Sequence, residues 1–286
     1  MRSSVLAVLL FLGGCAVDVG STSDAPTEAG AAALEGTVGV LEIDRRVEDE
    51  GALLTAAFAR YHGLAEQDVV TLVSSGARAE LDACTMVDGD VRLPLDADVE
   101  LVDVGALDVR LEDAGIVSGS SRLVARTFPD VASVMAGVFY AGEAALPLPR
   151  ADRDAYVVHA SGGRDVGTFR VTVAAPAEVA VLVYGDEDGT VARDRSLDFS
   201  WVPGGAQAGA QDVIELEVAS RGGTIVCTAA DDGAFRIEPA MLSRLVVDQD
   251  AELVVRRVRV RAFDAEGLDS AFARVAITRS EHVAIH

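Results

Sequence analysis

Residues 253–263 read LVVRRVRVRAF, and this run decides the fold class. Apolar residues alternate in it with arginines, namely Val258, Val260 and Ala262 with Arg257, Arg259 and Arg261. Alternation with a period of two is the pattern of a β-strand, because successive side chains point to opposite faces of a sheet. The run therefore predicts a strand with its valines toward a core and its arginine row facing outward.

A second run with the same period occupies residues 213–218, VIELEV. Ile214, Leu216 and Val218 are expected to face the core, so Glu215 and Glu217 face outward. If the two strands are neighbours, the arginine and glutamate rows pair across the sheet, and each pair contributes about 0.2–1 kcal/mol. The alternative is that the arginine row forms an anion-binding stripe.

The region around these runs predicts about seven strands, the number of an immunoglobulin-like (Ig-like) sandwich. The expected strands cover residues 178–184, 197–201, 214–218, 224–228, 235–237, 253–263 and 271–278. Between the fifth and sixth strands, Pro239 is expected to open a short helical turn that runs to Leu245, because proline suits the first helical position.

Part of this region resembles fibronectin type III modules. The resemblance rests on Leu197-x-Phe199-x-Trp201-x-Pro203 and on residues 258–267, VRVRAFDAEG. In such modules the second strand ends in Trp followed by Pro, and the sixth strand leads into a small turn with Gly. The sequence departs from the family because the sixth strand has no Tyr and because the helical turn is extra. The resemblance implies an Ig-like domain over residues 176–286, with the third and sixth strands as neighbours.

The preceding residues, 36–175, also favour strands, at 37–44, 99–111, 154–158 and 168–173. Residues 53–61 fit either a helical stripe or one face of a strand, and the strand is preferred because the neighbouring segments are strands. Ala174-Ala175-Pro176-Ala177 is the expected domain junction, since proline cannot donate to a central ladder. The prediction is an all-β chain with two β-sandwich domains.

The first residues, MRSSVLAVLLFLGGC, have the features of an export signal, namely a positive Arg2 and a short apolar run. The end, Leu12-Gly13-Gly14-Cys15, resembles the lipobox of bacterial lipoproteins, and the whole layout resembles uncharacterised lipoproteins of high-GC Gram-negative bacteria. The resemblance implies a signal peptide over residues 1–14 and lipidation of Cys15. Ala16 in the next position implies transfer to the outer membrane. The alternative is an ordinary secretory signal in which Cys15 is incidental.

A flexible tether is expected over residues 15–35, which are rich in small and polar residues.

The whole chain has 286 residues and a net charge of −22, and it contains no lysine and no asparagine. These absences exclude a P-loop lysine, a Schiff-base lysine and a Cys–His–Asn triad. The acidic charge is a poor fit to nucleic acid, which requires clustered basic residues.

Residues that could carry chemistry are scattered. The four histidines, His62, His159, His282 and His286, have no metal-ligand spacing. Cys84 and Cys227 either form a disulfide, which export permits, or remain two buried thiols. Three acidic turns are candidate calcium sites, although none matches the calcium-loop pattern. Their residues are Asp186, Asp188, Asp231, Asp232, Asp264 and Glu266.

We therefore expect no catalytic residues, no resident metal and no cofactor. The leading hypothesis is a non-enzymatic envelope lipoprotein with a binding or structural role, attached to the membrane through Cys15 and contacting an envelope protein or glycan. One alternative is a calcium-dependent adhesion module. Another is an envelope hydrolase that uses a pair of carboxylates brought together by the fold, since such pairs converge in space rather than in sequence.

Overall fold

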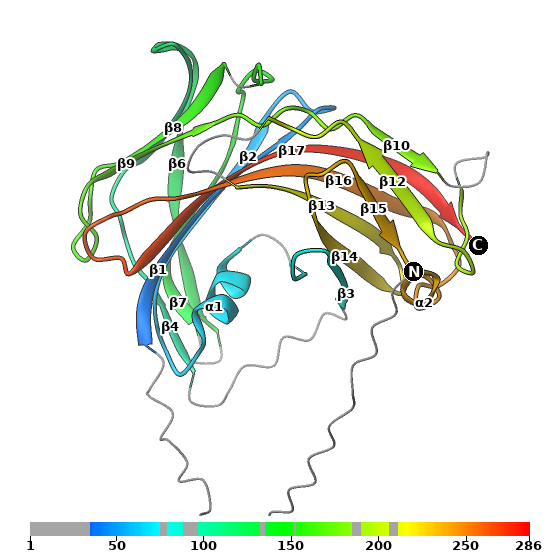
Figure 1. Ribbon diagram of the computed structural model, residues 1–286. Coiled ribbons are helices and arrows are strands. Elements are labelled where there is room, and N and C mark those ends of the chain that lie inside the picture. The colour runs from blue at the N-terminus through cyan, green and yellow to red at the C-terminus, as the bar shows by residue number, and fades with distance from the viewer. Residues whose placement is uncertain are drawn as a thin grey trace, which may run out of the picture. The chain divides into compact units, whose positions relative to one another are not determined.

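A computed structural model describes residues 35–74, 79–87, 97–131, 135–151, 153–184, 190–205 and 211–286 (Figure 1). These residues contain seventeen strands and two short helices, so the prediction of an all-β chain is confirmed. The expected signal peptide, Cys15 and all of the expected tether but its last residue lie outside the described residues, as do Asp186 and Asp188.

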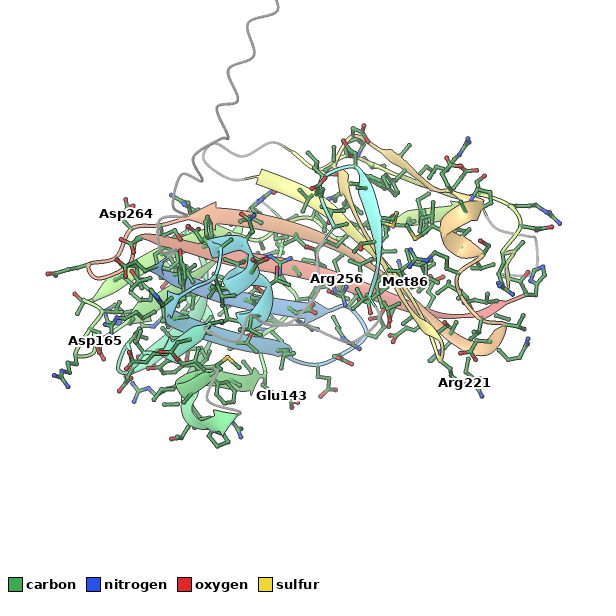
Figure 2. All side chains as sticks on the ribbon, turned by 90° about the horizontal axis from the view of Figure 1, so that it is seen from below. Met86, Glu143, Asp165, Arg221, Arg256 and Asp264 are labelled. Carbon is green, nitrogen blue, oxygen red and sulfur yellow. A yellow bond between two sulfur atoms is a disulfide. The ribbon has the colours of Figure 1, made fainter. Side chains whose placement is uncertain are left out.

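The main sheet has thirteen strands, twelve of them in one hydrogen-bonded path. In spatial order these are β14 (Gly223–Ala230), β13 (Gln211–Ser220), β16 (Asp248–Ala262), β17 (Ser270–Ile285), β1 (Glu35–Arg46), β2 (Ala52–His62), β4 (Asp98–Leu101), β7 (Met135–Ala144), β6 (Ile116–Val131), β5 (Leu107–Asp113), β8 (Asp154–Ala160) and β9 (Phe169–Ala174). The short β11 (Thr190–Val191) pairs with β17. Seen from below, Arg256 lies near the middle of this sheet (Figure 2).

A smaller sheet contains β10 (Val181–Tyr184), β12 (Leu197–Trp201) and β15 (Ala234–Ile237). It packs on one face of β13, β14 and β16 through a shared core that includes Phe199, Trp201, Ile214, Leu216 and Val255. This part of the chain is therefore a two-layer β-structure. Its short helix α2 (Pro239–Leu242) begins at Pro239, as the sequence predicts.

Two further elements, β3 (Ala83–Val87) and α1 (Glu66–Val73), pack against strands of the main sheet. β3 lies along β14. Asp82, the residue that precedes β3, accepts a hydrogen bond from the backbone N–H of Ala230. α1 packs on β1 and β2, in a core that includes Val38, Val40 and Val69. Figure 1 shows α1 and β3 on the same side of the main sheet. Residues 53–61, which fit a helix or a strand, lie in strand β2.

The expected division into two sandwich domains is not confirmed. β1, from the first expected domain, pairs in parallel with β17, from the second, with a register that runs from Val38 opposite Ser270 to Arg46 opposite Thr278. The main sheet therefore continues across the expected junction at residues 174–177, and residues 33–286 form one compact unit. The period of a strand shows which residues share a face but does not identify the strand that pairs with it.

The third and sixth strands of the fibronectin-like order are neighbours, as predicted, because β13 pairs with β16. The expected faces of β16 are wrong. Ile214 lies opposite Arg257, so the arginine row shares a face with the buried residues of β13. Arg257 is 2% exposed and Arg259 is 1% exposed, whereas the glutamates of β13 lie on the opposite face. A shift of one residue reverses the facing of every side chain in a strand.

The arginine row binds main-chain carbonyls and the carboxylates of Asp231 and Asp212, instead of the expected glutamates of β13. Arg261 donates to the carbonyl of Thr172 on the outer strand β9, at 2.8 Å. Arg259 donates to the carbonyls of Ala174 and Ala175, and Arg257 donates to those of Ala177 and Glu178. These donors pair with carbonyls of the edge strand β9 and of the segment after it. Unpaired backbone groups at a sheet edge favour aggregation, so this pairing protects the edge. The expected linker is thus held against the main sheet.

The contribution of Asp154 to stability is expected to depend on pH. Its buried carboxylate accepts hydrogen bonds from the backbone N–H of Arg150 at 2.7 Å and from the Arg150 guanidinium at 3.0 Å. Burial alone would raise the pKa of Asp154, but these hydrogen bonds and the positive charge of Arg150 outweigh it and hold the pKa below its usual value. The stabilisation is therefore present above the unfolded-state pKa of about 4 and is lost as the pH falls through the folded-state pKa.

We expect Arg150→Gln to lower the urea midpoint of unfolding at pH 7 by a small amount, because solvent screens the exposed guanidinium. At pH 2.5 the variant and the wild type should unfold at the same urea concentration. Arg164→Gln, at an exposed position, serves as the control and should change neither value. An effect of equal size at both pH values would contradict this role of Asp154.

Candidate functional site

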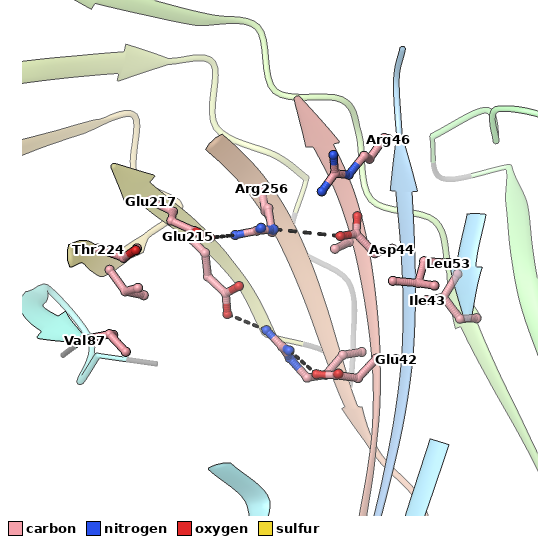
Figure 3. A pocket seen from close by; sticks show the side chains of 13 residues that line it. Glu42, Ile43, Asp44, Arg46, Leu53, Val87, Glu215, Glu217, Thr224 and Arg256 are labelled. Carbon is pink, nitrogen blue, oxygen red and sulfur yellow. Dashed lines mark hydrogen bonds and ion pairs between the residues drawn. The ribbon is translucent and has the colours of Figure 1, made fainter. Parts of the chain in front are cut away.

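The charged groove is a hollow of about 350 Å³ on the face of the main sheet opposite the arginine row (Figure 3). Its charged side chains are Glu42, Asp44, Arg46, Glu215, Glu217, Arg256 and Arg274, and Thr224, Leu53, Val87, Val226 and Ala276 are among the other residues that line it. The charged residues come from four adjacent strands, β13, β16, β17 and β1.

Alternation along each strand places these side chains on one face. On β1, Glu42, Asp44 and Arg46 are two residues apart and share a face, while Leu41 and Ile43 point into the core on the other side. On β13, Glu215 and Glu217 alternate with core residues in the same way. The charges therefore meet across strands that are distant in sequence.

One ion-pair network is centred on Arg274 of β17. Its Nη1 donates to Glu42 and its Nη2 donates to Glu215, and the Arg274 side chain is 10% exposed. Burial would lower the pKa of Arg274, but the charges of Glu215 and Glu42 and their hydrogen bonds outweigh it and raise the pKa. Arg274 is thus a permanently charged group held between two carboxylates.

A second network is centred on Arg256 of β16 and is more exposed than the first. The Nη1 of Arg256 donates to Glu217 at 2.8 Å. Its closest approach to Asp44 is 3.9 Å, between Nε and Oδ2, which is too long for a hydrogen bond. Asp44 accepts a hydrogen bond from the hydroxyl of Thr278 instead. Arg256 therefore retains donors that face the groove.

Arg46 lies at the end of the groove near Asp44, and Figure 3 shows its guanidinium beside Asp44, on the side away from the Arg274 network. This exposed side chain has no ion pair or hydrogen bond with any residue that the structure describes. Four carboxylates and three guanidinium groups line the groove, so its formal charge is 3 − 4 = −1. The groove can accept both a positive and a negative group of a ligand.

The described calcium candidates do not form a metal site. Both carboxylate oxygens of Asp231 are used, by the indole of Trp201, the backbone N–H of Gly204 and Arg257. Asp232, Asp264 and Glu266 belong to no group of three or more metal-ligating side chains among the described residues. His62, which lies 3.8 Å from Glu35, and the other three histidines belong to no such group either.

The two cysteines that the structure describes are joined. Cys84 of β3 and Cys227 of β14 form a disulfide with a Cα–Cα distance of 4.0 Å. Of the two alternatives that the sequence leaves open, the structure therefore has the disulfide rather than two thiols. The bond holds β3 at the edge of the main sheet, where Val87 lines the charged groove.

Two other hollows are weaker candidates. An apolar pocket of about 180 Å³ lies between α1 and strands β2, β4 and β7 and includes Leu72, Met135 and Phe139. An open, mainly acidic cleft of about 520 Å³ lies at the ends of β1, β2 and β4 and includes Tyr61 and Asp98. Neither contains the concentration of buried, oriented charge that distinguishes the charged groove.

Sequence reasoning missed most of the groove. Glu215 and Glu217 stood out only as the expected partners of the arginine row, and Glu42 only as a strand residue. The available signal was the charge at alternate positions 42, 44 and 46, although Arg45 interrupts the alternation. It could not be interpreted without the register of β1 against β17.

Comparison of the chain with protein families, with characterised proteins and with solved structures gives no match. Neither helix of the described residues is long and apolar enough to cross a membrane. The geometry and charge of the groove are therefore the grounds on which a function is proposed.

Proposed function

We propose that this chain is an exported, lipid-anchored envelope protein that binds a charged ligand or partner in the charged groove and is not an enzyme. Anchoring and location at the outer membrane are supported by the lipobox-like Leu12-Gly13-Gly14-Cys15. The Cys84–Cys227 disulfide is in keeping with export, because disulfides persist in oxidising compartments. The observation that carries the binding role is the groove itself, with charges of both signs held on rigid strands.

Binding is favoured over chemistry by the state of the groove's side chains. Arg274 already occupies an oxygen of Glu42 and an oxygen of Glu215, and Arg256 occupies an oxygen of Glu217. No histidine or cysteine is among the described residues that line the groove. Rigid strands carrying partly satisfied charges provide orientation and electrostatic complementarity, which are the requirements of a specific binding site.

The anchor is tested by growth with labelled palmitate. Wild-type protein should carry the label and remain with membranes, whereas Cys15→Ala should lose at least 90% of both, because the acyl chains on that thiol are the proposed attachment. The double variant Cys84→Ala/Cys227→Ala is the matched control and should keep the label. Label that persists on Cys15→Ala would contradict the proposed anchor.

A hydrolase is the second candidate, and one observation favours it: Glu42 and Glu215 lie on either side of Arg274 in one groove, as an assembled carboxylate pair would. Hydrolysis by such a pair requires one of the two carboxyl groups to donate a proton. Assays of the wild type and of Glu215→Gln against a panel of glycosides separate the two proposals. Turnover that disappears in Glu215→Gln would favour the enzyme over the binding protein.

A further inference from the structure

The end of the charged groove near Asp44 has the features of a carboxylate-binding site. Arg46 has no side-chain partner among the described residues, and Arg256 has a single short contact, to Glu217. A guanidinium carries five N–H donors and binds carboxylates through two parallel hydrogen bonds. Figure 3 shows both guanidinium groups beside Asp44, at the same end of the groove. Together they leave several donors open to the groove.

The other side of the groove has the features of an ammonium-binding site. Glu215 and Glu217 project from β13 beside Thr224 of β14 (Figure 3). Each ionised carboxylate has about four acceptor positions, and each of these two has one hydrogen bond from an arginine in the structure. Their remaining positions, together with the Thr224 hydroxyl, suit the three donors of a primary ammonium group.

The overall charge of the groove distinguishes a zwitterion from a simple ion. With a formal charge of −1 the groove disfavours a ligand that is a net anion, whereas a simple cation would leave the guanidinium donors of Arg46 and Arg256 unused. Its volume of about 350 Å³ is at the low end of the range of small-molecule pockets. We propose that the charged groove binds a small zwitterionic amino-carboxylate, with its carboxylate between Arg46 and Arg256 and its ammonium group at Glu215 and Glu217.

This assignment rests on the proposed binding role of the groove and adds the ligand class to it. A purely structural role accounts less well for the arrangement. Buried ion pairs seldom stabilise a fold more than apolar residues of the same volume would, because removing charges from water is costly.

The test is calorimetric titration of the full-length protein in detergent, in a buffer without zwitterions. The probes are unbranched α,ω-amino acids from glycine to 6-aminohexanoate. The n-alkylamines and n-alkylcarboxylates of matched length, together with inorganic phosphate, are the single-charge controls. We expect at least one amino acid to bind ten-fold or more tightly than both of its single-charge analogues. Arg46→Gln and Glu217→Gln should each weaken that binding at least ten-fold.

The matched control is Arg164→Gln, an exposed arginine outside the groove, which should bind as the wild type does. Urea unfolding of each variant checks that the fold is retained. Equal binding of amino acids and their single-charge analogues, or unchanged binding by Arg46→Gln, would overturn the assignment. If phosphate or an alkylamine binds tightest and Arg46→Gln weakens it, the groove is a binding site for a different ligand class. If no probe binds, the ligand assignment fails, while the palmitate experiment still decides the anchor.

Discussion

Asp231→Ala should destabilise the protein by about 3–5 kcal/mol, the range for removing one partner of a buried ion pair. The carboxylate of Asp231 is 7% exposed and lies 3.0 Å from the Nε of Arg257, which is more deeply buried still. It also accepts hydrogen bonds from the indole of Trp201 at 2.8 Å and from the backbone N–H of Gly204 at 2.9 Å. The substitution therefore leaves a buried cation without its counter-ion and two further donors without their acceptor.

Urea unfolding at pH 7 measures this loss. The neighbouring Asp232→Ala is the matched control, because Asp232 is exposed and accepts a 3.3 Å hydrogen bond from the backbone N–H of the nearby Ala234. It should change the free energy of unfolding by about 0.5 kcal/mol or less, as ordinary surface substitutions do. The double variant Asp231→Ala/Arg257→Met removes the stranded charge and should recover part of the loss. A change below about 1 kcal/mol in Asp231→Ala would show that Arg257 does not depend on this carboxylate.

Local features of this region could be predicted from the sequence. Leu197, Phe199 and Trp201 alternate with polar residues, and all three are buried in β12. Pro239 begins α2 because proline fits the first helical turn, where its missing N–H has no intrahelical partner. Each of these outcomes depends on residues close together in the chain, so the sequence alone contains the necessary information.

The faces of β16 and the composition of the groove could not be predicted in this way. Arg257 looks like a surface residue because its neighbours are charged, yet its acceptors are the carbonyls of Ala177 and Val202 and the carboxylate of Asp231. Val258, on the opposite face, is also fully buried, so both faces of β16 are covered. Alternation identifies which residues share a face, but it cannot assign the faces when neither is exposed to water.

The groove depends on a pairing of even longer range. Glu42 and Arg274 are 232 residues apart and become neighbours only because β1 lies parallel to β17. No local property of residues 35–46 specifies that partner, since a parallel neighbour requires a crossover connection rather than a tight turn. This is why the sequence predicts an all-β chain but neither the single continuous sheet nor the site that the sheet creates.

Loss of the Cys84–Cys227 disulfide should have an effect of similar size, about 3–5 kcal/mol. The bond joins residues 143 positions apart, and in the chain-entropy model a cross-link over a loop of about 100 residues or more removes roughly 4.7 kcal/mol of freedom from the unfolded chain. Some contacts of β3 persist without the bond, such as the hydrogen bond from the Ala230 N–H to Asp82. They stabilise the folded state, so they do not replace the restriction that the disulfide places on the unfolded chain.

The measurement compares urea unfolding of the wild type with and without reductant, and of Cys84→Ala/Cys227→Ala under the same two conditions. Reductant should lower the midpoint of the wild type and leave that of the double variant unchanged, since the variant has no bond to break. Because Cys227 is fully buried, the small cavity left by the substitution is expected to add about 1 kcal/mol to the variant's loss. If reduction of the wild type costs less than about 1 kcal/mol, the unfolded chain is already restrained near these residues. The disulfide would then serve chiefly to hold β3 beside the charged groove.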